Sequence, residues 1–363
     1  MRVGVLGSGQ LGRMLAHAGD PLGHTFIFFD TDAGEATRGI GRTVTGSFSD
    51  KEALTAFAAM CDVVTYEFEN VPCEAAHHIA GIVPVYPPPR ALEVSQDRLI
   101  EKEFFTSLGI ATPPFRAASS ERELRAACHE VGFPCVVKTR RMGYDGKGQA
   151  VARHENELQN VWSRLGHAPL IVEGFISFSR ELSVIAARDK TGEIVIYPLA
   201  RNTHTEGILF RTEFPAPMVP PELEREAHAI ISRVLEELDY VGVLTIELFD
   251  ANGTLVANEM APRVHNSGHI TIDAATTSQF ENHIRAVTGM PLGDPTPRAR
   301  GIMYNLIGKL PPDDSVHASP TVKVHLYGKS ERKGRKIGHI NLLNPTELDE
   351  STLAQVVQTA NLL

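Results

Sequence analysis

The first part of the chain alternates short apolar runs with amphipathic segments. Runs with the length of buried strands lie at residues 3–6, 25–29 and 62–66. Segments with helical spacing lie at residues 10–18, 51–60 and after Pro72. Strands that alternate with helices in this way are typical of a parallel, doubly wound sheet. Residues 1–95 are therefore predicted to form an N-terminal α/β domain, and the proline run 87–89 marks a boundary through which no helix can continue.

Beyond this boundary the pattern predicts a mixture of helices and strands. Helices are expected over residues 96–108 and 221–238. Strands are expected over residues 133–138, 170–173, 181–187 and 193–199. A second proline-rich break, at 291–297, introduces a C-terminal unit in which Arg and Lys gather between residues 323 and 336.

The most informative segment is residues 245–269, TIELFDANGTLVANEMAPRVHNSGH. Two alternating apolar runs flank a turn at 250–253, which is the signature of an antiparallel hairpin. A three-residue loop would place Glu247 opposite Ala257, with Glu259 one diagonal step away on the same face.

Two carboxylates that converge on one sheet face repel each other unless a cation lies between them. Glu247, Glu259 and the amide oxygen of Asn258 suit Mg²⁺, which takes few protein ligands and completes its shell with phosphate oxygens. A surface hairpin with solvated acids is the alternative, although the apolar opposite face favours a lined site. Donors suited to a small oxyanion follow the strand: Arg263, His265, Asn266 and Ser267.

A second candidate site is the glycine-rich loop after Lys138. Its glycines let the backbone approach a triphosphate and permit hinge motion, and Lys147 at its tip could close on the transferred phosphate. A flexible surface hairpin is the alternative, and the Walker pattern is absent. Residues 173–176 continue an apolar strand into a turn suited to hydrogen-bonding an adenine edge, and Glu181 could accept from ribose hydroxyls.

A G-x-G-x-x-G turn at residues 7–12 connects the first strand to the first helix. Its amides could hold a phosphate, and Asp30 ends the next strand where a dinucleotide fold places its ribose-binding acid. This pattern favours a nicotinamide-dependent dehydrogenase as one alternative. The same glycines also serve tight turns and close packing in any such unit.

Composition describes an ordinary globular protein of 363 residues, 42% hydrophobic and 22% charged. The net charge of -9 argues against a nucleic-acid surface, although it allows local phosphate sites. The apolar runs are too short to span a membrane, the chain begins at once with a strand, and the four cysteines show no C-x-x-C spacing. A cytoplasmic location is therefore expected.

The order of these features resembles the ATP-grasp superfamily of carboxylate–amine ligases. Finer motifs are similar to those of the 5-(carboxyamino)imidazole ribonucleotide synthetase family: GSGQLGRML, YEFENVP, GYDGKGQ, NEMAPRVHNSGH and RKGRKIGHIN. The resemblance covers essentially the whole chain. It implies an N-terminal domain (1–95), an ATP-grasp domain with a lid subdomain (96–170) and a main subdomain (171–290), and a small C-terminal domain (291–363) packed on it.

The resemblance also implies roles for individual residues. ATP contacts are implied for Arg98, Lys138, Gly143, Gly146, Gly148, Gln149, Glu173, Gly174, Phe175, Ile176, Glu181, His204, Asn258 and Glu259. The metal ligands are Glu247, Glu259 and Asn258, for Mg²⁺ or Mn²⁺. Roles in the lid and in binding bicarbonate are implied for Tyr144, Asp145, Lys147, Arg263, His265 and Asn266. The ribonucleotide contacts are Gln10, Glu67, Glu69, Lys329 and Arg335.

The implied reaction is the ATP-dependent carboxylation of 5-aminoimidazole ribonucleotide by bicarbonate. The resemblance also implies that the enzyme is a homodimer. Two residues depart from the family pattern. Met142 stands where glycine is usual, which is expected to stiffen the first hinge of the lid, and Lys333 replaces a proline near Arg335. Formate-dependent glycinamide ribonucleotide transformylase and biotin carboxylase are rivals with the same nucleotide site. A silent nucleotide-binding regulator is disfavoured because both late glutamates are present.

Overall fold

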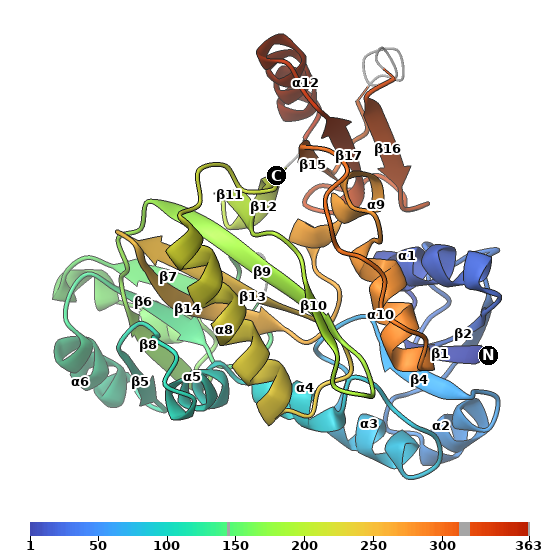
Figure 1. Ribbon diagram of the computed structural model, residues 1–363. Coiled ribbons are helices and arrows are strands. Elements are labelled where there is room, and N and C mark those ends of the chain that lie inside the picture. Colours follow the sequence, from blue (N-terminus) through green and yellow to red (C-terminus); the bar gives the residue numbers. More distant parts are fainter. Residues whose placement is uncertain (144–145, 312–319, 362–363) are drawn as a thin grey trace.

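The N-terminal part of the chain forms a parallel four-stranded sheet with helices on both faces (Figure 1). The computed structural model describes residues 1–143, 146–311 and 320–361. The strand order is β3-β2-β1-β4. The elements are β1 (Arg2–Leu6), α1 (Gln10–Gly19), η1 (Asp20–Leu22), β2 (Thr25–Asp30), β3 (Arg42–Thr45), α2 (Lys51–Ala58), β4 (Val63–Tyr66) and α3 (Cys73–Ala80). The predicted α/β fold is confirmed.

Alternate residues of β1 enter two different cores, as expected for a strand buried on both faces. Val3 and Val5 pack with α1 and with α10 (Gln279–Thr288), whereas Leu6 packs with α2 and α3. Because α10 also packs on the large sheet described below, it joins the N-terminal domain to the rest of the molecule (Figure 1).

A second, antiparallel sheet has the strand order β5-β8-β6-β7 and is covered by α6. Its elements are β5 (Phe115–Ala118), α6 (Glu121–Val131), β6 (Cys135–Thr139), β7 (Gln149–Ala152), η2 (Glu155–Leu158), α7 (Val161–Arg164) and β8 (Leu170–Gly174). Two helices lead into it, α4 (Pro89–Ser95) and α5 (Arg98–Ser107). The predicted lid boundary at 170/171 would divide β8, so the strand pairing favours a boundary after Gly174.

A nine-stranded sheet forms the centre of the molecule, in the order β14-β13-β9-β11-β12-β15-β17-β16 with β10 beside β9. Its strands are β9 (Arg180–Arg188), β10 (Ile194–Ile196), β11 (Ala200–Thr205), β12 (Ile208–Phe214), β13 (Gly242–Ala251), β14 (Thr254–Ala261), β15 (Gly301–Ile307), β16 (Val322–Leu326) and β17 (Lys336–Leu343). Its helices are α8 (Pro221–Glu237), η3 (Asn266–Gly268), α9 (Thr271–Ala274), α10 and α12 (Glu347–Ala360). One face packs on α8 and the other on α10, while α12 packs on the C-terminal strands.

The sequence pattern missed several of these elements. β11 is mostly polar, and β12 has only a short apolar start before its polar Arg-Thr-Glu segment, so neither shows the longer apolar run that identifies a strand. The proline run does more than end the first domain, because Pro89 is the first residue of α4, where its missing N–H costs nothing. Across the described ranges, no helix has both the length and the apolar character needed to cross a membrane.

Candidate active site

The N-terminal domain, the small antiparallel sheet and the nine-stranded sheet together line a cleft of about 660 Å³. Most of the predicted site residues line it: Gln10, Glu67, Glu69, Arg98, Lys138, Gly143, Gly146, Lys147, Gln149, Glu173, Gly174, Phe175, Ile176, Glu181, His204, Glu247, Asn258, Glu259, Arg263, His265 and Asn266. Gly148, Lys329 and Arg335 lie outside this lining, and Tyr144 and Asp145 lie outside the described residues.

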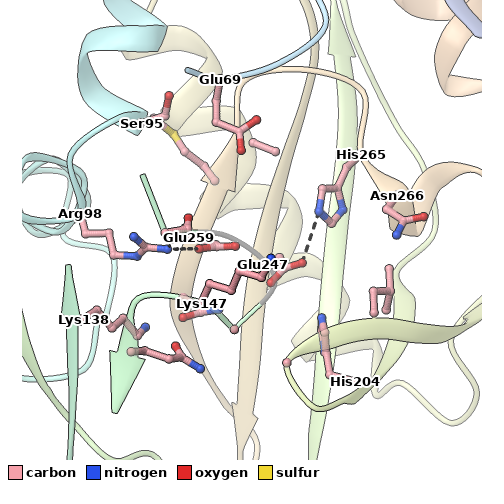
Figure 2. A pocket seen from close by; sticks show the side chains of 18 of the residues that line it. Glu69, Ser95, Arg98, Lys138, Lys147, His204, Glu247, Glu259, His265 and Asn266 are labelled. Carbon is pink, nitrogen blue, oxygen red and sulfur yellow. Dashed lines mark hydrogen bonds and ion pairs between the residues drawn. The ribbon is translucent and has the colours of Figure 1, made fainter. Parts of the chain in front are cut away.

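The floor of the cleft carries Glu247 on β13 and Glu259 on β14, which are direct cross-strand partners. The predicted register, with Glu247 opposite Ala257, is wrong for two reasons. Asn252 and Gly253 form a two-residue turn, both with left-handed φ, and a bulge follows at Asn258. Together these changes bring the two carboxylates face to face (Figure 2).

The bulge also changes where Asn258 points. Neighbouring side chains of a regular strand face opposite sides of the sheet, yet Asn258 and Glu259 both line the cleft. The side-chain oxygen of Asn258 is buried and has no hydrogen-bond partner among the described residues. Two facing carboxylates and an unsatisfied amide oxygen fit a hard divalent cation.

The electrostatics of the pair agree with that fit. Burial, followed by the adjacent Glu259, raises the pKa of Glu247 to about 7. Within the described ranges, no group of three His, Cys, Asp or Glu side chains could hold a metal. A cation at Glu247, Glu259 and Asn258 would therefore need further oxygens from a ligand, which is how Mg²⁺ is bound beside phosphates.

His265 lies beside this pair, with Nε2 at 3.4 Å from a Glu247 oxygen (Figure 2). Burial and the nearby Arg263 hold the pKa of His265 well below its usual value, so its ring is neutral. The Ser267 amide donates to Nδ1 at 3.3 Å, which leaves the ring proton on Nε2, facing the carboxylate. The side-chain nitrogen and oxygen of the adjacent Asn266 are buried and have no hydrogen-bond partners within the part of the chain that the structure describes.

Arg263 is already paired within the cleft. Its Nε donates to Glu69 at 2.5 Å. Burial disfavours the charged carboxyl, but the guanidinium outweighs it and lowers the pKa of Glu69. Sequence motifs placed these two residues in different substrate pockets, whereas the structure brings them together as an ion pair between the N-terminal domain and the hairpin.

Lys138 lies one residue before the end of β6, next to its predicted place at the strand end, and donates to Glu173 at 2.7 Å. Glu173 is buried, and the lysines around it outweigh burial and lower its pKa. One of these is Lys102, a buried residue of α5 that sequence reasoning missed. Further along the cleft, His204 pairs with Glu181; burial opposes a charge on the imidazole, but the carboxylates outweigh it and raise its pKa.

The glycine-rich loop is fastened at its base by Arg98. Its guanidinium donates to the carbonyls of Thr139 and Gly143, each at 3.0 Å, and lies 3.8 Å from Glu259. A side chain at Gly143 would collide with this guanidinium. Met142 adopts a left-handed φ of 63° and is 72% exposed, so a bulky residue occupies a conformation that favours glycine.

Replacing Met142 with glycine is expected to loosen this loop with little effect on overall stability. Relief of a left-handed conformation, about 1 kcal/mol, is offset by the roughly 0.5–1 kcal/mol entropic cost of glycine. Hydrogen exchange should become faster at residues 146–148 in Met142→Gly. Met142→Ala keeps the strained conformation and is the control; equal exchange in both variants would contradict a stiffened hinge.

The G-x-G-x-x-G turn holds a carboxylate of the protein itself. Glu67 accepts from the amides of Gly9 and Gly12, the latter at 2.7 Å, and side chains at Gly7 or Gly9 would collide with it. Asp30 accepts from the Ser8 amide and hydroxyl. The groups that would bind a dinucleotide are therefore occupied, and the dehydrogenase alternative fails.

The C-terminal cations lie next to this turn. Lys329 donates to Gln10 at 2.9 Å, and Arg335 pairs with Glu35 at 2.9 Å. Burial, then the charge of Arg335, lowers the pKa of Lys329 to about 8. A partly buried ammonium that lies near Arg335 and donates to Gln10 is suited to binding an anion.

Comparison with known families agrees with this architecture. The ATP-grasp domain model matches residues 103–280, which contain the small antiparallel sheet and the strands β9–β14 of the large sheet. The chain therefore contains an ATP-grasp domain. The ribonucleotide synthetase preATP-grasp domain matches residues 1–96, and the phosphoribosylaminoimidazole carboxylase C-terminal domain matches residues 301–352.

Relatives of nearly equal length specify the family. The N5-carboxyaminoimidazole ribonucleotide synthase of Pseudomonas aeruginosa is 46% identical over 94% of both chains. The crystal structure of the N5-carboxyaminoimidazole ribonucleotide synthetase from Thermus thermophilus is 48% identical over 99% of both chains, with a TM-score of 0.94. This chain belongs to the N5-carboxyaminoimidazole ribonucleotide synthase family.

A further relative was solved with its ligands. The synthase of Aspergillus clavatus, in complex with ADP and 5-aminoimidazole ribonucleotide, is 30% identical over 98% of this chain and 97% of its own, with a TM-score of 0.90.

Proposed function

We propose that this chain carboxylates the exocyclic amine of 5-aminoimidazole ribonucleotide with bicarbonate and ATP, giving 5-(carboxyamino)imidazole ribonucleotide, ADP and phosphate. The proposal depends on one observation: Glu247 and Glu259 face each other in a cleft lined by the N-terminal domain, the small antiparallel sheet and the nine-stranded sheet. Membership of the synthase family supports the same reaction.

Bicarbonate is a poor electrophile, so it must be activated before an aromatic amine can attack it. Phosphoryl transfer from ATP makes carboxyphosphate, and the negative charge that develops must be neutralised. Mg²⁺ held by Glu247, Glu259 and Asn258 would supply part of that charge. Lys138, held by Glu173 at the end of β6, would position the triphosphate from the opposite wall.

The bicarbonate pocket is assigned to Asn266, His265 and Arg263. Asn266 offers a buried amide with no partner in the described ranges 1–143, 146–311 and 320–361, so its donor is available to a small anion. His265 presents a neutral ring, and Arg263 presents a guanidinium that Glu69 holds in place. The acceptor amine is placed near Glu67, whose carboxylate the turn amides hold in one orientation.

Lys147 is assigned to the lid, together with Tyr144 and Asp145. Carboxyphosphate, or the CO₂ that it releases, must meet the amine before water does, so closure of the glycine-rich loop protects the intermediate. Lys147→Ala is expected to slow turnover about 10-fold or more and to release ADP in excess of carboxylated product. The ratio of ADP to product measures the coupling; an unchanged ratio with unchanged rate would remove Lys147 from the lid.

The test of the overall proposal is ADP release with Mg²⁺ and bicarbonate, with and without 5-aminoimidazole ribonucleotide. Release that requires the ribonucleotide supports the proposal. Release with formate and glycinamide ribonucleotide would support the transformylase, and saturable NADH binding without ADP release would support a dehydrogenase. A homodimer and a cytoplasmic location remain predictions, which sedimentation and cell fractionation would check.

A further inference from the structure

Two adjacent residues of α5, Glu101 and Lys102, lie buried against β14 and take no part in the chemistry described above. Lys102 is 1% exposed and Glu101 is 2% exposed. Lysine and glutamate are rarely buried to this extent without a partner. Both carry hydrogen bonds to the backbone of β14.

The ammonium of Lys102 is directed at the bulge. It donates to the carbonyl of Asn258 and, at 3.3 Å, to the carbonyl of Ala257. The third oxygen near it belongs to Glu173, at 3.7 Å. The three donors of a lysine therefore face two backbone oxygens at the bulge and one carboxylate on β8.

Glu101 binds the backbone of β14 on the other side of Glu259. Its carboxylate accepts from the Met260 amide at 2.7 Å. Among the strands that the structure describes, β14 is at the edge of the large sheet, so no described strand pairs with these backbone groups. Glu101 and Lys102 supply the hydrogen bonds that a neighbouring strand would otherwise make, one on each side of Glu259.

We propose that Glu101 and Lys102 are positioning residues that hold the bulge at Asn258, so that Asn258 and Glu259 face the cation together. This inference rests on the proposed function, since it assigns Asn258 and Glu259 to the metal. A bulge leaves its extra residue unpaired in the ladder, so external hydrogen bonds are needed to fix its orientation. Through Glu173, Lys102 also connects the metal side of the cleft with Lys138.

The experiment measures Mn²⁺ binding in the presence of ADP by electron paramagnetic resonance, which needs no turnover. Lys102→Met keeps the length of the side chain and removes the ammonium. It is expected to weaken Mn²⁺ binding about 10-fold or more, the usual effect of losing a residue that supports metal ligands. Binding of ADP without metal should change less than about 3-fold.

Arg180→Met is the matched control. Arg180 pairs with buried Asp250 at 2.8 Å, near the turn of the same hairpin, so its loss also removes a buried ion pair. A purely structural role for Lys102 predicts equal losses of Tm and equal, small changes in Mn²⁺ binding for both variants. That result would overturn the proposal, whereas a loss of Mn²⁺ affinity confined to Lys102→Met supports it.

Glu101 provides a second test that does not depend on the folding of Lys102→Met. Glu101→Gln keeps an acceptor for the Met260 amide and should bind Mn²⁺ nearly as the wild type does, whereas Glu101→Met should bind it about 10-fold more weakly. Equal binding by the two variants would overturn the proposal. If the wild type binds Mn²⁺ with ADP but does not react with the ribonucleotide, the proposed function is refuted. The positioning role of Glu101 and Lys102 would still hold.

Discussion

Replacing Glu259 with glutamine is expected to lower ADP formation by about 100- to 1,000-fold while the fold persists. The amide keeps the shape of the side chain but removes a charged ligand for the cation, and metal-assisted stabilisation of developing charge is worth several kcal/mol, at about 1.4 kcal/mol per factor of ten. The metal-free protein should keep nearly the stability of the wild type, because the substitution removes both the like-charge repulsion with partly buried Glu247 and the 3.8 Å ion pair with Arg98. Steady-state ADP release and thermal unfolding measure the two effects.

Glu193→Gln is the control for this substitution. Glu193 is exposed between β9 and β10 of the same sheet, outside the cleft, so the variant should turn over at the wild-type rate. Normal ADP formation by Glu259→Gln would remove Glu259 from the metal site. An equal loss in both variants would indicate a general effect of charge.

The hairpin shows how far the sequence pattern could lead. Alternating apolar residues around an Asn-Gly turn predicted the two strands and the shared face of Glu247 and Glu259. The register depends on the two-residue turn and on one inserted residue, and Asn258 carries no local signal that marks it as a bulge. The bulge is fixed by Lys102 from α5, a contact distant in the sequence, so only the structure reveals it.

The burial of charged side chains is the second feature that could not be predicted from the sequence. Glu101 and Lys102 lie in a segment that reads as an amphipathic helix, where charged residues usually mark the solvated face. Likewise, the turn at Gly7–Gly12 reads equally well as a phosphate site, and only the position of Glu67 decides against it. Motif order identified the cleft, whereas the pairing of Arg263 with Glu69 follows from how the domains meet.

Lys329→Ala is expected to raise the KM for the ribonucleotide about 10- to 100-fold and the KM for ATP less than about 3-fold. A hydrogen bond to a charged phosphate is worth roughly 1.5–3 kcal/mol, and Lys329 lies with Gln10 at the edge of the N-terminal domain, away from the hairpin. Initial rates at varied ribonucleotide and fixed ATP, and the reverse, separate the two constants. Lys333→Ala, which removes an exposed charge from the same loop, is the control.

The same residue predicts a dependence on pH. With a pKa of about 8 in the free protein, lowered from 10.5, Lys329 loses its charge as the pH rises through 8. The KM for the ribonucleotide should therefore rise above pH 8, whereas Lys329→Arg, which stays charged, should give a flatter profile. For folding the sign is opposite: between pH 8 and 10.5 the unfolded chain holds more protons at this group, so its contribution to the free energy of unfolding increases with pH. A ribonucleotide KM that stays constant from pH 7 to 9 in the wild type, or equal KM effects on both substrates in Lys329→Ala, would count against a phosphate contact at Lys329.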